Sequence, residues 1–432
     1  MPDSRPGGGF GAVLRNAGWL LAGKGVGAVL SLAYLAMTAR TLGAERFGQF
    51  TLILGTGQAV SALVTFQSWQ VIVRYGMAHL KEGRHQALAR LVAFCTWLDL
   101  GAAIVGCVIA TVSVLLLAPE LGWSPGLAHA ALAFCFVTLL AIRSTAVGVL
   151  RLYDRFGVGA IADSTTPITR FIGSVVVVTT HASVRGFLVT WAASEIVTTI
   201  AYWVLARRVA GPALVLPTLH GADRAPAENP EIWHFTWMTN VSSTLNAVSQ
   251  QFSVIIVGLA TGPVAAGNYR LAYQLSQSIV RVSEMFSRAI FAELTRAHIG
   301  QTRPNLERLF SNLMRFAVVA GAAVILVLLL GKPVLALIAG KGHEAADLPL
   351  RLLGLAAAID LAGVGFEPAL IAMGLARRAF LLRIAATVCL VIGFILLLPR
   401  FGAPGAATAT LISSVFGLVL FGRAAFRAIR LS

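Results

Sequence analysis

Long runs of apolar residues, separated by short polar clusters, dominate the chain. A helix that rises about 1.5 Å per residue needs about 20 such residues to cross about 30 Å of hydrocarbon. The runs therefore predict about twelve membrane-spanning helices. The fifth and eighth are the least hydrophobic, so eleven or thirteen spans also fit the pattern. We place the expected spans at 17–38, 47–70, 91–117, 127–149, 160–180, 186–206, 235–259, 268–290, 313–338, 350–373, 380–399 and 404–425.

The composition points to the same class of protein. Of the 432 residues, 57% are hydrophobic and 12% are charged, against about 25% charged residues in soluble domains. A soluble core of this length would need far more polar surface, and the mean hydropathy is +0.80. The chain is therefore predicted to be an all-α integral membrane protein, and a disordered chain, a disulfide scaffold and a collagen-like fibre are excluded.

The positive charges indicate an orientation in the membrane. The net charge of +16 would suggest nucleic-acid binding in a soluble protein, but most of the 34 Lys and Arg residues flank alternate ends of the apolar runs. By the positive-inside rule both termini are expected in the cytoplasm, which requires an even number of spans. We expect the first span to be retained rather than cleaved as a signal peptide. The opposite set of flanks holds Arg40, Arg46, Arg185, Lys332, Lys341 and Arg400.

A proline-rich segment at the midpoint divides the chain into two predicted halves. The longest loop lies there, on the expected cytoplasmic side, and resembles a linker between bundles. The predicted organisation is a cytoplasmic segment at 1–16, a six-helix bundle at 17–206, a cytoplasmic linker at 207–232, a second six-helix bundle at 233–425 and a cytoplasmic tail at 426–432.

The two halves also carry an internal repeat. Gly43, Gly48, Phe50 and Leu52 correspond, at a constant offset, to Gly262, Gly267, Tyr269 and Leu271. Such residues recur by chance in loops of this kind, but both segments follow the first span of their half. Six helices and a cytoplasmic start in each half predict a parallel repeat. Two bundles facing a central cavity are the expected architecture.

Signatures of enzymes and metal sites are absent from the sequence. Gly18, Gly23 and Lys24 resemble the start of a phosphate-binding loop, but Gly25 follows where Ser or Thr is required, and no strand precedes them. The four cysteines lie inside apolar runs without paired spacing, which argues against a disulfide framework or a zinc site. We therefore expect a transporter that needs no cofactor, and an enzyme is the minority interpretation.

Polar residues within the spans carry the functional information, because a charge in the membrane is costly unless it faces a wet cavity or a partner. In the second, seventh and eighth spans polar residues recur at steps of three and four, which places them on one face of each helix. We expect these faces to line the cavity. Their members are Gln58, Ser61, Thr65 and Ser68, then Asn240, Ser243 and Gln250, then Arg270, Gln274, Gln277, Arg281, Glu284 and Arg288.

Several of these charges have structural alternatives. Lys24, deep in the glycine-rich first helix, is the strongest candidate for a functional cation. Arg170 either contacts substrate or is neutralised by Asp99 or Glu195 on neighbouring helices. These two carboxylates serve either as counter-ions or as binding sites for a coupling ion. Arg281, Glu284 and Arg288 can pair within their own helix. Snorkelling to the nearer membrane surface is the expected role of Arg143, Arg315 and Arg351.

The N-terminal motif resembles a known family. It comprises Asn16 and Trp19, followed by the segment from Ala39 to Phe50 with its echo in the second half. This pattern, together with twelve spans and the repeat, is similar to polysaccharide flippases (Wzx type) of the multidrug/oligosaccharidyl-lipid/polysaccharide exporter superfamily. The resemblance covers the whole chain and implies a MATE-like fold. It implies a multi-pass protein of the bacterial inner membrane that moves undecaprenyl-diphosphate-linked oligosaccharide to the periplasmic leaflet by alternating access.

A substrate of this kind suits the predicted cavity. Its diphosphate needs cationic donors, and its sugar hydroxyls need amides and hydroxyls. Candidate cations are Lys24, Arg170, Arg270 and Arg281. Candidate polar contacts are Gln58, Asn240, Gln250 and Gln277, and the candidate coupling carboxylates are Asp99 and Glu195.

The expected partners are the lipid-linked oligosaccharide, membrane lipids and the polysaccharide polymerase and glycosyltransferases that make and use it; we expect a monomer. Two rival functions remain open. One is a cation-coupled multidrug exporter of the same superfamily, which would rely on Asp99 or Glu195. The other is a membrane-embedded polymerase or glycosyltransferase.

Overall fold

Helices make up every regular element in the part of the chain that the computed structural model describes, namely residues 10–211, 221–277, 331–340, 342–363, 366, 370 and 375–431. Five of the helical segments found there are long and apolar enough to cross a membrane. The predicted class, an all-α membrane protein, is therefore confirmed. The number of twelve spans stays a prediction, since most of the ninth expected span lies outside the described residues.

The chain folds into two compact units. The first comprises the described residues of Met1–Leu42 and Ile53–Phe252, and the second those of Gly43–Leu52 and Ser253–Ser432. Each unit has its own packed core. The predicted linker at 207–232 stays a prediction. The two compact units divide between Phe252 and Ser253, in the helix that follows this segment.

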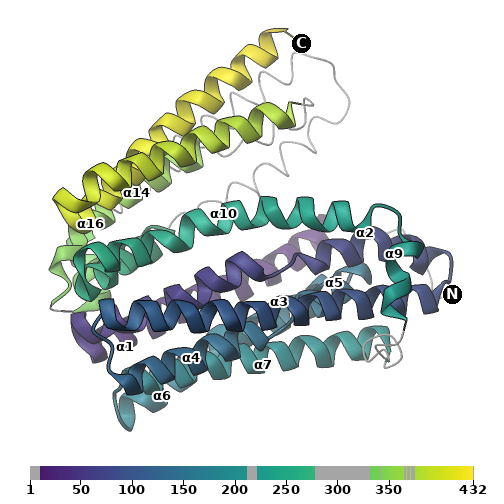
Figure 1. Cartoon of the computed structure of the whole chain (residues 1–432), viewed down its shortest axis with the longest axis horizontal. Coiled ribbons are helices and arrows are strands. Elements are labelled where there is room, and N and C mark those ends of the chain that lie inside the picture. The colour runs from purple at the N-terminus through teal and green to yellow at the C-terminus, as the bar shows by residue number, and fades with distance from the viewer. Residues whose placement is uncertain are drawn as a thin grey trace. The chain divides into compact units, whose positions relative to one another are not determined.

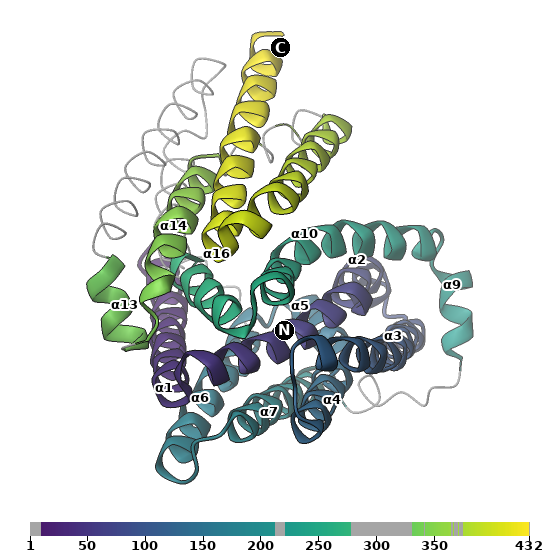
Figure 2. The same cartoon turned by 60° about the vertical axis from the view of Figure 1, so that its left-hand side comes forward.

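The first unit contains most of the described helices. Within it α4 packs between α3 and α7, and α6 lies along α7 (Figures 1 and 2). The helices run as α1 (Phe10–Val64), α2 (Ser68–Lys81), α3 (His85–Glu120), α4 (Pro125–Leu140), α5 (Ser144–Leu152), α6 (Phe156–Thr179), α7 (Val184–Ala210), the short η1 (Ala222–Arg224), α9 (Ala225–Glu228) and α10 (Ile232–Thr261), of which the last passes into the second unit.

Two of the expected spans are interrupted. Residues 65–67 are not helical and separate α1 from α2, and residues 141–143 likewise separate α4 from α5. The second and fourth spans were expected to be continuous. Because α2 packs against α5, the two breaks are neighbours in space. Interrupted helices leave backbone groups that other parts of the protein must satisfy, and inside a membrane they occur where protein or a water-filled cavity surrounds them.

A ladder of polar contacts joins α6 to α7. Along it the Tyr202 hydroxyl donates to Asp163 at 2.6 Å, and the Thr166 and Thr198 hydroxyls lie 2.6 Å apart. These polar groups explain why α6 is not among the described helices that qualify as spans by hydropathy. Hydrogen bonds between side chains hold helices together in membranes, where hydrophobicity alone does not.

Replacing Tyr202 by Phe is expected to lower the free energy of unfolding by about 1–3 kcal/mol, because a short hydrogen bond to a carboxylate is lost. Thermal unfolding of the purified protein in detergent measures the change. Tyr75→Phe is the matched control, since its buried hydroxyl has no hydrogen-bond partner within the described residues. An equal loss of stability in both variants would contradict the role given to the ladder.

The second unit is built from fewer described helices. They are residues 253–261 of α10, residues 263–277, α13 (Gly331–Ala339), η2 (Glu344–Ala346), α14 (Asp347–Ala362) and α16 (Ala376–Leu431), to which residues 43–52 of α1 are added. Gly402, with φ 60°, breaks α16 between the two last expected spans, as Gly43, with φ 71°, breaks α1 between the first two.

Repeat-related residues meet inside this unit. Gly43 and Gly262 both adopt positive φ, 71° and 90°. Gly267 packs against the backbone of Gly48, and a Cβ on Gly267 would lie 3.1 Å from the Gly48 Cα. The equivalent segments 43–52 and 262–271 therefore both begin with a glycine of positive φ and contact each other, which agrees with the predicted internal repeat.

Candidate functional site

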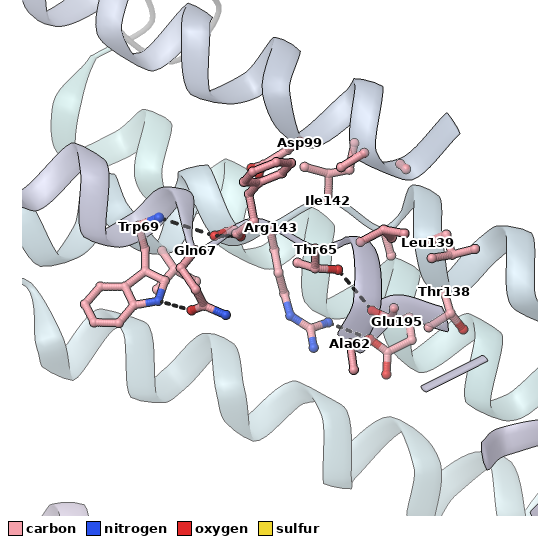
Figure 3. Close-up of a pocket in the computed structure, with 18 of the residues that line it drawn as sticks. Ala62, Thr65, Gln67, Trp69, Asp99, Thr138, Leu139, Ile142, Arg143 and Glu195 are labelled. Carbon is pink, nitrogen blue, oxygen red and sulfur yellow. Dashed lines mark hydrogen bonds and ion pairs between the residues drawn. The ribbon is translucent and has the colours of Figure 1, made fainter. Parts of the chain in front are cut away.

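A cavity of about 520 Å³ lies in the first unit, where the two helix breaks come together (Figure 3). Its volume falls within the range of about 300–1,000 Å³ that is usual for ligand sites. Both breaks line it, together with the C-terminal part of α1, the middle of α3 and α7, and Thr244 of α10. Polar lining residues are Gln58, Ser61, Thr65, Gln67, Asp99, Thr138, Arg143, Ser144, Glu195 and Thr244.

Asp99 ties the two broken helices together. Its carboxylate accepts a hydrogen bond at 2.5 Å from Ser68, the first residue of α2, and one at 2.7 Å from Thr145, near the start of α5. Asp99, Ser68 and Thr145 are all buried. Helix N-termini carry positive partial charge, so a carboxylate placed between two of them is electrostatically favoured. Asp99 therefore holds both helix starts at the wall of the cavity.

Ser144 satisfies backbone groups that the first break exposes. Its hydroxyl accepts from the Trp69 backbone N–H at 3.3 Å and donates to the Phe66 carbonyl at 3.2 Å. The second break is satisfied from α7, since Trp203 Nε1 donates to the Ile142 carbonyl at 2.7 Å and Thr199 to that of Ala141 at 3.2 Å. The breaks are thus held in place by side chains from other helices.

Glu195 of α7 is shared by two arginines. Arg143, in the α4–α5 break, donates through Nη1 to Oε2 at 2.6 Å, and Arg170 of α6 donates through Nη2 to Oε1 at 2.8 Å. Figure 3 shows the Arg143 side chain extending across the cavity wall to Glu195. The cluster carries two positive charges against one negative charge. When Asp99 is included, the two arginines and the two carboxylates of this region balance in formal charge.

The structure brings only some of the predicted site residues to this cavity. Gln58, Asp99 and Glu195 line it. Arg170 does not line it, and its expected neutralisation comes from Glu195 and not from Asp99, whose oxygens bind Ser68 and Thr145. Asn240 is buried in α10, one helical turn before Thr244.

The other predicted residues are placed elsewhere or not described. Arg270 and Gln277 lie in the helical residues 263–277 of the second unit, where both are half-buried. Lys24 and Gln250 lie in the helices α1 and α10, but their side chains fall outside the description. Arg281 lies outside the described residues.

Sequence reasoning missed the role of Arg143. It was expected to snorkel to the membrane surface, whereas its guanidinium pairs with Glu195 at the cavity. The neighbouring Ser144 and Thr145 offered a signal, because Ser and Thr are favoured at helix starts. A helix start in the middle of an expected span implies a break. The same signal is present at Ser68, after the apolar run of the second span.

The comparisons with known proteins agree with this fold. A family model described as a polysaccharide biosynthesis protein matches residues 13–297. The chain belongs to this family. Among curated proteins, this member of the polysaccharide biosynthesis family is similar to the inner membrane protein YghQ of Escherichia coli (strain K12). The two are 30% identical over 352 residues, which cover 79% of this chain and 96% of the relative.

Solved structures show the same fold at low sequence identity. The lipid II flippase MurJ in an inward closed conformation matches with a TM-score of 0.74 and 12% identity, covering 95% of this chain and 89% of that chain. An inward-facing multidrug resistance MATE family transporter of the MOP superfamily matches with a TM-score of 0.71 and 14% identity, covering 93% and 96%. The expected MATE-like fold is therefore confirmed for this polysaccharide biosynthesis protein.

Proposed function

We propose that the chain is a flippase of the bacterial inner membrane that moves an undecaprenyl-diphosphate-linked oligosaccharide from the cytoplasmic to the periplasmic leaflet. The family match to polysaccharide biosynthesis proteins is the observation that carries the proposal. The fold shared with a lipid II flippase and the relative from the inner membrane support it. Both termini lie in the cytoplasm on this proposal, as the charge distribution predicts.

The cavity has the chemistry that such a head group requires. Arg143 lines the cavity and offers guanidinium donors to phosphate, and the starts of two helices lie at its wall. Gln58 and Ser61 of α1 and Thr65 of the first break line the cavity and offer amide and hydroxyl groups to sugar hydroxyls. On this proposal the lipid tail stays in the bilayer while the two halves of the protein alternate in access. Lys24, Arg270 and Arg281 remain candidate cations, and Asn240, Gln250 and Gln277 candidate polar contacts.

The described contacts of the candidate coupling carboxylates favour the counter-ion alternative. Glu195 is occupied by two arginines and Asp99 by two hydroxyls. Either group would have to give up these partners before it could bind a coupling ion. We therefore propose a flippase whose carboxylates hold the site together.

Deletion of the gene tests the function. Lipid-linked oligosaccharides with complete repeat units are expected to accumulate on the cytoplasmic leaflet while the surface polymer is lost, because assembly requires substrate outside. Radiolabelled sugar incorporation and analysis of extracted lipids measure both, and complementation with the wild-type gene is the control. Unchanged polymer with new sensitivity to cationic drugs would favour a multidrug exporter, and incomplete repeat units would favour an enzyme.

A further inference from the structure

We propose that Arg143 is the residue that contacts the diphosphate of the substrate, and that it does so by exchanging Glu195 for phosphate while Arg170 stays on Glu195. This inference rests on the proposed function and names the residue that recognises the anionic group. Its basis is the asymmetry between the two arginines that share one carboxylate, of which Figure 3 shows Arg143 with Glu195.

The guanidinium of Arg170 has two hydrogen-bond partners and lies close to two aromatic rings. Its Nε donates to the Ser194 hydroxyl at 2.9 Å and its Nη2 donates to Glu195. The guanidinium also lies 5.2 Å from the ring centre of Trp191 and 6.0 Å from that of Tyr34. Its side chain is 15% exposed and does not line the cavity. Arg170 is therefore a positioning residue that keeps Glu195 in place.

Arg143 has the opposite character. Its side chain is 37% exposed, it lines the cavity, and the hydrogen bond that the structure gives it is the one from Nη1 to Glu195. It lies in the non-helical residues 141–143, so its backbone is not locked into a helix. A guanidinium has five N–H donors in a planar fork that matches phosphate. The hydrogen bond to Glu195 uses one of these donors, in a residue that lines the cavity.

The exchange leaves the half-buried Glu195 with a partner. When Arg143 turns from Glu195 to a phosphate, the carboxylate keeps the ion pair with Arg170 at 2.8 Å. Removing the sole partner of a buried charge is strongly unfavourable, whereas removing one of two is much less so. The positive end of α5, which starts at the next residue, adds to the attraction for the anion. Glu195 thus holds Arg143 at the cavity when the site is empty and releases it to substrate.

Binding of farnesyl diphosphate to the purified full-length protein in lipid nanodiscs tests the exchange. Arg143→Ala is expected to weaken binding by about tenfold to a hundredfold, the effect of one charge-assisted hydrogen bond. Arg143→Lys should restore only part of it. Glu195→Gln is expected to bind more tightly than the wild type, because the competing carboxylate charge is gone.

A double-variant cycle separates the two arginines. Arg170→Ala should weaken binding, because Glu195 then has Arg143 alone and holds it more firmly. Adding Glu195→Gln should restore binding in the Arg170→Ala background but not in the Arg143→Ala background. Arg90→Ala is the matched control, since Arg90 forms an ion pair of 2.5 Å with Glu228 away from the cavity, with side chains 25% and 26% exposed.

The outcomes distinguish this inference from the proposed function. Wild-type affinity in Arg143→Ala, or weaker binding in Glu195→Gln, would overturn the role of Arg143 and leave the flippase proposal standing. Absence of farnesyl diphosphate binding by the wild-type protein would overturn both. Inorganic diphosphate is the second probe, and an equal affinity for it would assign the site to a free anion and contradict a lipid-linked source.

Discussion

Asp99→Ala is expected to abolish production of surface polymer, because the carboxylate is the common acceptor for the starts of α2 and α5. Its loss leaves the buried hydroxyls of Ser68 and Thr145 without this acceptor, at a cost of about 1–3 kcal/mol for each unsatisfied group. Both helix breaks lose their connection at the cavity wall. Polymer production in a deletion strain complemented with the variant measures the effect, and thermal unfolding in detergent measures the lost stability.

Asp99→Asn separates positioning from charge. The amide has nearly the same shape, and its oxygen and N–H groups can each pair with a hydroxyl. If Asp99 acts by joining the two breaks, this variant should keep most of the activity and stability. A folded but inactive Asp99→Asn protein would contradict that role and favour a coupling carboxylate. Asp163→Asn is the control, because Asp163 also accepts from a hydroxyl, that of Tyr202, but does not line the cavity.

The polar face of the second span shows what the sequence can predict about the site. Residues at helical spacing share a face whatever the rest of the fold does, and Gln58, Ser61 and Thr65 do line one cavity. The pattern predicts a cavity because a polar helix face is energetically unfavourable against lipid. The length of the apolar runs likewise predicted the class of fold, an all-α membrane protein.

The helix breaks could not be predicted in this way. Ala141 and Ile142 are apolar and continue the run of α4 without a change in pattern. What permits the break is a set of hydrogen bonds from distant positions, such as Trp203 to the Ile142 carbonyl. Arg143 was misjudged for the same reason. Because Arg143 lies near the end of the expected span, its side chain was predicted to reach the membrane surface. Its partner Glu195 lies on α7, and hydropathy does not predict which face of α7 is turned toward Arg143.

The sequence also could not predict which carboxylate pairs with which arginine. Asp99 and Glu195 were equivalent candidates to neutralise Arg170, since each lies within an expected span. The structure separates them by their neighbours, because two hydroxyls surround Asp99 and two guanidinium groups surround Glu195. Such pairings decide which charged groups in a cavity remain available to a ligand, and the number of charged residues in the spans does not.

Gly48→Ala is expected to destabilise the protein more than Gly267→Ala or Gly101→Ala. A Cβ at Gly48 would overlap the backbone carbonyl of Pro263, which cannot rotate away as a side chain would. Overpacking of this kind costs about 1–3 kcal/mol or more. Gly267→Ala should have a smaller effect in the same direction, since its Cβ would lie 3.1 Å from the Gly48 Cα.

The control for these variants is Gly101→Ala, because Gly101 lies in α3 and a Cβ there meets no atom within 4 Å. Alanine favours a helix over glycine by up to about 1 kcal/mol, so this variant should be neutral or slightly stabilising. Melting temperatures in detergent give the order Gly101→Ala, Gly267→Ala, Gly48→Ala from most to least stable. A Gly48→Ala protein as stable as Gly101→Ala would show that the repeat-related segments do not pack closely. In lipid, where hydrophobicity does not drive helices together, two glycines allow helix backbones to pack closely. The contact between the two repeat-related segments is therefore expected to stabilise the fold.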